Sequence, residues 1–300
     1  MRRRRSMILS AGAVLMALLL VGASSAELLA GRPEPMTLLA ARPTAPPPAA
    51  LPDPTAALGV LARKATAEAE RRGADISFTL IDRQTGRLVS GGDKAPFPIA
   101  SVAKLFIADD LLLQIAQKRT GLSPQDRRAL EMMLRSSDDF AAGEFWVRDG
   151  GNAVITRVAK RYTLTDTTVP YNGDWWNTMS TTADLARYYD MLLDGTGGLP
   201  PEYAAIILSN LAASTPVGVD GYPQRFGIPD GLYAEPVAVK QGWMCCWGPN
   251  NQVHLSTGVV GPQRRFVIAI ASMQPADEVT ARNTLTEVLK TMFPGGRITP

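Results

Sequence analysis

Two polar residues at the head of an apolar segment have the types and the spacing that acyl transfer requires. Ser101 and Lys104 are three positions apart in the run Phe-Pro-Ile-Ala-Ser-Val-Ala-Lys, and the segment 101–117 predicts a helix that begins at Ser101 and is apolar nearly all round. Residues three apart lie on one face of a helix. Burial there would lower the pKa of Lys104 and make it a base for the Ser101 hydroxyl. For the pair alone, the alternative is an N-cap serine and a solvated lysine.

A second pair of polar residues follows the helix predicted at 124–134. In Ser137-Asp138-Asp139, a serine displayed between helices could pass a proton to a leaving group. The polar residue two positions later, Asp139, could hold a substrate amide. The alternative is a surface loop or a helix cap.

A third motif, Lys240-Gln241-Gly242, ends a predicted strand. A lysine at a strand end would attract a substrate carboxylate, and Gly242 would let an extended substrate lie against the strand edge. This motif means little alone, so the interpretation depends on all three motifs occurring in this order.

The elements that must position these motifs form one domain over 55–300. Helices are predicted at 56–72, 101–117, 124–134, 152–161, 181–194, 201–213 and 277–293, and strands at 76–82, 87–90, 237–242, 252–260 and 264–273. A single sheet must then bring the N-terminal hairpin beside the C-terminal strands. This is an α+β arrangement.

Composition excludes several other functions. The 300 residues are 46% hydrophobic and 20% charged, as in ordinary globular proteins. The net charge of +3 falls to 3 − 4 = −1 without residues 1–26, which hold four arginines and no acid, so no nucleic-acid partner is expected. One histidine, His254, and two adjacent cysteines cannot form an ordinary Cys/His zinc site. We expect no metal and no cofactor.

The N-terminus predicts export. Arginines at 2–5, an apolar run at 11–21 and small residues up to Ala26 are typical of a secretory signal peptide over 1–26, using the Sec or the twin-arginine route. An uncleaved signal anchor is the alternative, and it would give the only membrane contact. No cysteine follows the run, so a lipid-anchored mature terminus is not expected. Residues 27–54 contain eight of the 23 prolines and predict an extended Pro/Ala-rich linker or tether.

The three motifs together resemble the penicillin-recognising serine enzymes, which are the β-lactamases, chiefly class A, and the D-alanyl-D-alanine peptidases. The resemblance covers about residues 57–293. The stretches 101–110 and 224–246 are further similar to mycobacterial β-lactamase-like lipoproteins. This resemblance implies a three-layer α/β sandwich, with an antiparallel five-stranded sheet beside a helical lobe and the active site between them.

The resemblance also implies a role for each motif residue. Ser101 would be the acylated nucleophile, Lys104 the general base, Ser137 the proton shuttle and Lys240 the electrostatic anchor. The backbone N–H groups of Ser101 and Trp243 would form the oxyanion hole, in which each donor is typically worth about 10²–10³ in rate.

Three positions depart from the family pattern. Class A enzymes carry a glutamate after the second motif that activates the deacylating water, whereas residues 150–201 contain none. Asp174 is the nearest candidate and is one methylene shorter, so it would misplace the water. Asp139 stands where the family has asparagine, and Gln241 stands where it has threonine or serine.

Two functions are compatible with these features. The first is an exported, monomeric serine hydrolase of the cell envelope that acts on a peptidoglycan peptide or a related small amide or ester, with little or no β-lactam turnover. The second is an inactive relative that binds wall peptide or a protein partner. Cys245 and Cys246 would form a vicinal disulfide beyond the third motif, or remain as buried thiols.

Overall fold

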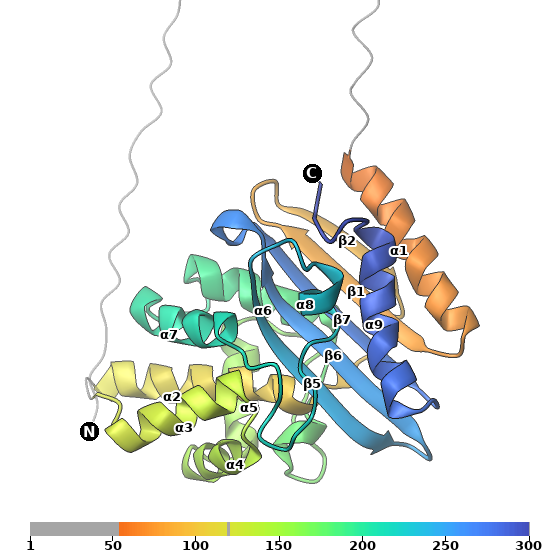
Figure 1. The fold of residues 1–300 in the computed structure, drawn as a ribbon. Helices are drawn as coiled ribbons and strands as arrows, with labels where there is room; N and C mark the ends of the chain where they lie inside the picture. Colours follow the sequence, from red (N-terminus) through yellow and green to blue (C-terminus); the bar gives the residue numbers. More distant parts are fainter. Residues whose placement is uncertain (1–53, 119–120, 300) are drawn as a thin grey trace, which may run out of the picture. The chain divides into compact units, whose positions relative to one another are not determined.

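A five-stranded antiparallel sheet lies at the centre of the domain, with the strand order β2-β1-β7-β6-β5 (Figure 1). The computed structural model describes residues 54–118 and 121–299, so the predicted signal peptide and all but the last residue of the predicted linker lie outside the described residues. The strands are β1 (Asp75–Asp82), β2 (Arg87–Gly92), β5 (Val237–Trp247), β6 (Asn251–Val260) and β7 (Phe266–Gln274). Phe78 of β1 pairs with Ile270 of β7, so the N-terminal hairpin joins the C-terminal strands as predicted.

Two helices cover one face of the sheet. α1 (Pro54–Arg71) and α9 (Glu278–Met292) pack against each other there, with the short α8 (Ile228–Gly231) beside α9 (Figure 1). Phe78, Ile268 and Leu285 belong to the core between these helices and the sheet. β1 and β7 are buried along nearly their whole length because helices cover both faces, which explains the continuous apolar run Phe-Val-Ile-Ala-Ile-Ala that begins β7.

A helical lobe covers the other face. Its helices are α2 (Lys104–Lys118), α3 (Pro124–Arg135), α4 (Asp139–Arg148), α5 (Asn152–Arg161), α6 (Thr182–Asp194) and α7 (Pro201–Ala212) (Figure 1). The lobe also contains a two-stranded ribbon of β3 (Phe97–Pro98) and β4 (Met179–Ser180). α6 packs on β1 and β7, and α7 packs beside β5. The fold is the predicted three-layer α+β arrangement.

Side-chain caps determine where the helices near the second motif begin. The Ser123 side chain accepts the N–H of Asp126, and Pro124 occupies the first position of α3. The Asp138 carboxylate accepts the N–H groups of Phe140 and Ala141 at the start of α4. Asp138 therefore ends the connection from α3, and Ser137 lies in that short connection.

Two carboxylates of α2 are buried in the lobe, each paired with an arginine of α5. Asp110 accepts from Arg157 Nε at 2.8 Å and from Arg157 Nη2 at 2.7 Å. Asp109, which is fully buried, accepts from Arg161 and from the Tyr162 hydroxyl. These pairs explain how a helix that is buried from Lys104 to Leu112 accommodates two acidic residues.

The structure differs from the predicted elements at the sites of the motifs. α4 was not predicted, and β5 extends five residues beyond the predicted end at 242. Ser101 is not an N-cap: it lies inside a 3-10 helix, η1 (Ala100–Ala103), that precedes α2 and follows Ile99. Among residues 54–118 and 121–299, no helix has both the length and the apolarity that a membrane span needs.

Candidate active site

Lys104 lies with no exposed surface beneath Ser101. Its Nζ donates to Ser101 Oγ at 2.8 Å, to the Ser137 carbonyl oxygen at 2.6 Å and to Asp139 Oδ1 at 2.6 Å. Burial lowers the pKa of Lys104, while the nearby Asp139 carboxylate partly opposes that shift. Lys104 Nζ therefore connects the first motif to the second.

The backbone is strained immediately before the serine of the first motif and at the serine of the second. Ala100 has φ +45° and Ser137 has φ +58°, a region that residues with a Cβ seldom adopt. Strain of this kind persists only where the surrounding structure enforces it, and it clusters at active sites. Here it presents Ser101 and Ser137 to the same lysine.

The third motif approaches from β5, which is an edge strand of the sheet. Lys240 is buried, and its Nζ donates to Ser137 Oγ and, at 3.1 Å, to the Gln241 carbonyl oxygen. Burial and then the charge of Lys104 lower the pKa of Lys240 well below its usual range. The structure thus brings together the predicted nucleophile Ser101, base Lys104, proton shuttle Ser137 and electrostatic anchor Lys240. Their roles stay predictions.

A cavity of about 230 Å³ opens at Ser101. Asp139 and Trp243, two of the residues predicted to bind substrate, line it. The Trp175 ring forms another wall and lies 4.7 Å, centroid to Nζ, from Lys104. The complete lining is Ala100, Ser101, Asp139, Trp175, Trp176, Asp220, Trp243 and Met244.

Asp174 and Gln241 were also proposed for the site, but neither lines this cavity and the side chain of each is bound elsewhere. Asp174 accepts from Asn172 Nδ2 at 2.7 Å, and the next residue, Trp175, occupies the cavity wall instead. Gln241 is buried, and its Nε2 donates to the carbonyl oxygens of Gln224 (3.0 Å) and Phe226 (2.6 Å). Successive residues of a strand point to opposite faces, so Gln241 cannot follow Lys240 toward Ser137.

Besides Ala100, four residues of the cavity lining were not among those predicted for the site: Trp175, Trp176, Asp220 and Met244. The doublet Trp175-Trp176 in a polar loop was the available signal, because exposed indoles in a loop often mark binding surfaces. Asp220 and Met244 carried no signal. Asp220 lies in the connection between α7 and α8, and it accepts from Trp243 Nε1 at 3.1 Å.

Tyr222 and His254 support Trp243 from behind. The Tyr222 ring stacks on the Trp243 indole, with centroids 4.7 Å apart and an interplanar angle of 10°. The Tyr222 hydroxyl and His254 Nε2 are 2.6 Å apart. Burial lowers the pKa of His254 to about 4, so its ring is neutral at pH 7 and serves to hold the aromatic stack in place.

Cys245 and Cys246 are joined by a disulfide at the outer end of β5. Both residues are exposed, and the pairing of β5 with β6 shifts register between Met244 and Trp247. The disulfide therefore lies in the irregular end of the strand, immediately after the cavity residue Met244.

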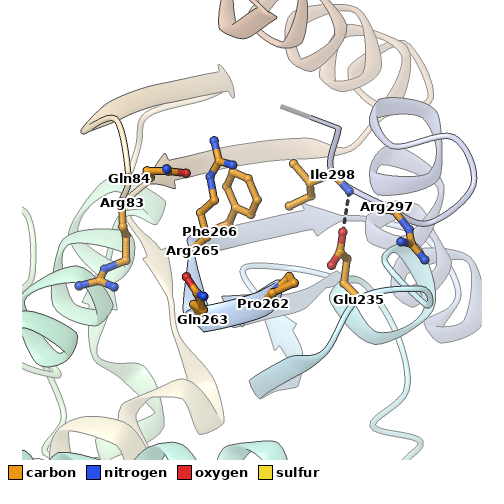
Figure 2. Close-up of a pocket in the computed structure, with 9 residues that line it drawn as sticks. All are labelled: Arg83, Gln84, Glu235, Pro262, Gln263, Arg265, Phe266, Arg297 and Ile298. Atoms are coloured by element: carbon orange, nitrogen blue, oxygen red, sulfur yellow. Dashed lines mark hydrogen bonds between the residues drawn. The ribbon is translucent and has the colours of Figure 1, made fainter.

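A larger cavity, of about 610 Å³, contains none of the motif residues (Figure 2). Arg83, Arg265, Arg297 and Glu235 contribute to its walls (Figure 2). Arg265 is already bound to Asp82 through two hydrogen bonds, of 2.9 and 2.7 Å, and Arg83 is paired with Asp190 at 2.9 Å. The smaller cavity at Ser101 is therefore the candidate active site.

The architecture matches known serine enzymes. No protein-family model matches this chain. The crystal structure of TLA-3 extended-spectrum β-lactamase superposes with a TM-score of 0.62 at 12% identity, covering 76% of this chain and 96% of that one. The structure of PBP-A superposes with a TM-score of 0.64 at 17% identity, covering 77% and 94%. The chain therefore has the fold of the penicillin-recognising serine enzymes, as its motifs predicted.

Sequence similarity defines the family more narrowly. The LppW lipoproteins of Mycobacterium bovis and Mycobacterium tuberculosis are each 57% identical to this chain over 284 residues, which cover 92% of the chain and 90% of the relative. The chain belongs to the LppW family.

Proposed function

We propose that the protein is an exported serine hydrolase of the cell envelope that works through an acyl-serine at Ser101. Its substrate is a peptidoglycan-type peptide or a related small amide or ester. The observation that carries this proposal is the 2.8 Å contact between Lys104 Nζ and Ser101 Oγ at the edge of the cavity, made by a fully buried lysine with a lowered pKa. The predicted signal peptide and the lipoprotein name of the relatives support the envelope location.

In this proposal the chain's own residues carry the protons. Neutral Lys104 accepts the hydroxyl proton of Ser101 while Ser101 Oγ forms a bond to the substrate carbonyl carbon. The bond from that carbon to the leaving nitrogen or oxygen then breaks. Ser137 Oγ, which accepts from Lys240 Nζ, gives the leaving group a proton and regains one from the lysines. A water molecule later attacks the acyl carbon, the bond from that carbon to Ser101 Oγ breaks, and the proton that the water loses restores the Ser101 hydroxyl as the acid is released.

The reaction with a penicillin is expected to stop at the acyl-serine, before water attacks the acyl carbon. The carboxylates lining the cavity are those of Asp139 and Asp220, and each already accepts a hydrogen bond, from Lys104 and Trp243 respectively. Residues 150–201, where class A enzymes carry the deacylating glutamate, contribute Trp175 and Trp176 to the lining and no carboxylate. A penicilloyl adduct on Ser101 should therefore persist for minutes or longer.

Intact-mass measurement tests the proposal. Purified protein is incubated with a fluorescent penicillin and, separately, with a fluorophosphonate, and one covalent adduct that is absent from Ser101→Ala is expected. Rapid hydrolysis of a chromogenic cephalosporin, abolished in Ser101→Ala, would contradict the persistence of the adduct. If folded protein forms no adduct with either probe, the proposal of a serine hydrolase is wrong.

One observation favours the alternative of an inactive binding protein. Asp139 Oδ1 lies 2.6 Å from Lys104 Nζ, and a carboxylate there stabilises the protonated lysine, which cannot act as a base. In that case the cavity would hold wall peptide or a protein partner without reacting. Binding of a peptidoglycan peptide by protein that neither probe labels would support this function.

Gly242 is expected to control the position of Ser101. A Cβ at this position would lie 2.8 Å from the Ile99 carbonyl oxygen and 3.1 Å from Val102 Cγ2, so either β5 or the turn carrying Ser101 must move. A misplacement of about 1 Å can cost about 10² in rate. Gly242→Ala should slow fluorophosphonate labelling of Ser101 by about that factor.

The matched control for Gly242→Ala is Gly143→Ala. Gly143 lies in α4, and a Cβ there would meet no atom within 4 Å. Labelling of Gly143→Ala should proceed at the natural rate. If Gly242→Ala also reacts at the natural rate, the close contact between β5 and η1 does not set the position of the nucleophile.

A further inference from the structure

The cavity at Ser101 is lined by two acidic side chains, whereas an enzyme that binds carboxylate-bearing substrates would need basic side chains there. We propose that this cavity selects substrates bearing an ammonium group, with Asp139 and Asp220 as the residues that determine the charge preference. This inference rests on the proposed function of the same site, because it names the class of substrate that Ser101 would acylate.

The two carboxylates lie on different walls of the cavity. Asp139 begins α4, and 72% of its side chain is exposed although its Oδ1 is bound to Lys104. Asp220, from the connection between α7 and α8, is also exposed, and its Oδ2 accepts from Trp243 Nε1. Both side chains are thus fixed at one oxygen by neighbouring protein groups while lining open space. Preorganised charges of this kind need little rearrangement to meet a cation.

The remaining walls are of the kind that binds cations. Trp175, Trp176 and Trp243 contribute three indole rings to a single cavity of about 230 Å³. The site already shows such a contact, since Lys104 Nζ lies 4.7 Å from the centroid of the Trp175 ring. Trp176 is 39% exposed, so its ring can receive a ligand group. Indole faces attract ammonium groups through the ring quadrupole, and nearby carboxylates add to that attraction.

No cation of the site is presented to a substrate carboxylate. Neither lysine is among the residues that line the cavity. Lys104 is surrounded by three acceptors, and Lys240 is bound to Ser137 Oγ and the Gln241 carbonyl oxygen. Burial lowers the pKa values of both lysines. The Gln241 amide donates to the backbone carbonyl groups of Gln224 and Phe226, so it is not free to bind a carboxylate.

Three unreactive amides of similar length test the charge preference directly. They are 4-(trimethylammonio)butanamide, its neutral carbon isostere 5,5-dimethylhexanamide, and the anionic 4-carbamoylbutanoate. Titration calorimetry with full-length Ser101→Ala protein measures binding alone, so the result does not depend on whether Ser101 is a nucleophile. The cationic amide should bind at least about tenfold more tightly than the isostere, and the anion more weakly than both. The difference should shrink in high salt.

Variants then assign the preference to a residue. Asp220→Asn in the Ser101→Ala background should weaken binding of the cationic amide by about tenfold and leave the neutral isostere unchanged. Asp75→Asn, at the exposed start of β1, is the matched control and should change neither. Equal affinity for the three amides, no binding of the cationic amide, or an equal effect of Asp220→Asn on cation and isostere would overturn the inference. If the cation preference holds but natural protein is never acylated, the hydrolase proposal fails while this inference stands.

Discussion

Replacing Lys104 with methionine is expected to slow acylation of Ser101 by fluorophosphonate by about 10²–10⁴, the range typical of general-base catalysis. Lys104 Nζ is the group bonded to Ser101 Oγ, and methionine keeps the length of the buried apolar stem while removing the base. The Asp139 side chain is largely exposed, so water can solvate it in the variant. Labelling rates from intact mass, with circular dichroism to verify the fold, measure the effect. Lys160→Met, at an exposed position of α5, is the control and should react normally.

The pH profile of the same reaction separates a base from a merely structural lysine. Only unprotonated Lys104 can accept a proton, so labelling of natural protein should accelerate as pH rises through the Lys104 pKa, which burial sets below that of a free lysine. Asp139 raises this pKa, with smaller contributions from Asp138 and Asp220. In Asp139→Asn the acceleration should therefore occur at lower pH. A profile that is flat, or that moves to higher pH in the variant, would show that Lys104 is not the base.

The second large effect concerns stability rather than catalysis. Arg161→Met should lower the free energy of unfolding by about 3–5 kcal/mol, the usual cost of leaving one partner of a buried ion pair without its counterion. Asp109 is fully buried, so the variant retains a carboxylate whose remaining polar partners are the hydroxyl groups of Tyr162 and Tyr188. Urea unfolding at pH 7 measures the loss. The control is Arg72→Met, whose ion pairs with Glu68 and Glu287 are exposed and should contribute about 0–1 kcal/mol.

Acid should partly rescue Arg161→Met. Burial already holds the pKa of Asp109 above its ordinary value, and Arg161 lowers it, so removing Arg161 raises it further. A carboxyl whose folded-state pKa is raised favours the folded state at low pH, and this contribution is lost as pH rises through the folded-state pKa. The deficit of the variant relative to natural protein should therefore be smaller at pH 5 than at pH 7. An equal deficit at both would indicate lost packing rather than a stranded charge.

Much of the fold could be predicted because its elements carry local signals. The apolar residues around nearly the whole of α2 and the turn residues of the β1–β2 hairpin identify these elements without knowledge of their partners. The pairing of β1 with β7 followed from the order of elements, since the C-terminal strands alone leave the hairpin unpaired. α4 was missed because its cap, Asp138, lies within a motif that was interpreted for its chemistry.

The residues of the candidate site likewise fall into those whose placement could be predicted from the sequence and those whose placement could not. Ser101, Lys104, Ser137 and Lys240 belong to short motifs at the ends of elements, so their convergence could be predicted once the order of elements was known. The direction of the Gln241 side chain could not, because it depends on carbonyl groups 15 and 17 residues away in the chain. The place of Asp174 depends on the path of a loop that directs Trp175 and Trp176, but not Asp174, into the cavity.

The indole-lined cavity also gives the protein a spectroscopic reporter of its own. Three of its five tryptophans, Trp175, Trp176 and Trp243, line the space where a ligand would sit. Two of these lie beside lysine Nζ atoms, and Trp243 stacks on Tyr222. Filling the cavity excludes water from these rings, so the intensity and the wavelength of intrinsic fluorescence should change with occupancy. Occupation of the site by any compound, including one that never reacts with Ser101, can thus be followed in real time on unlabelled protein.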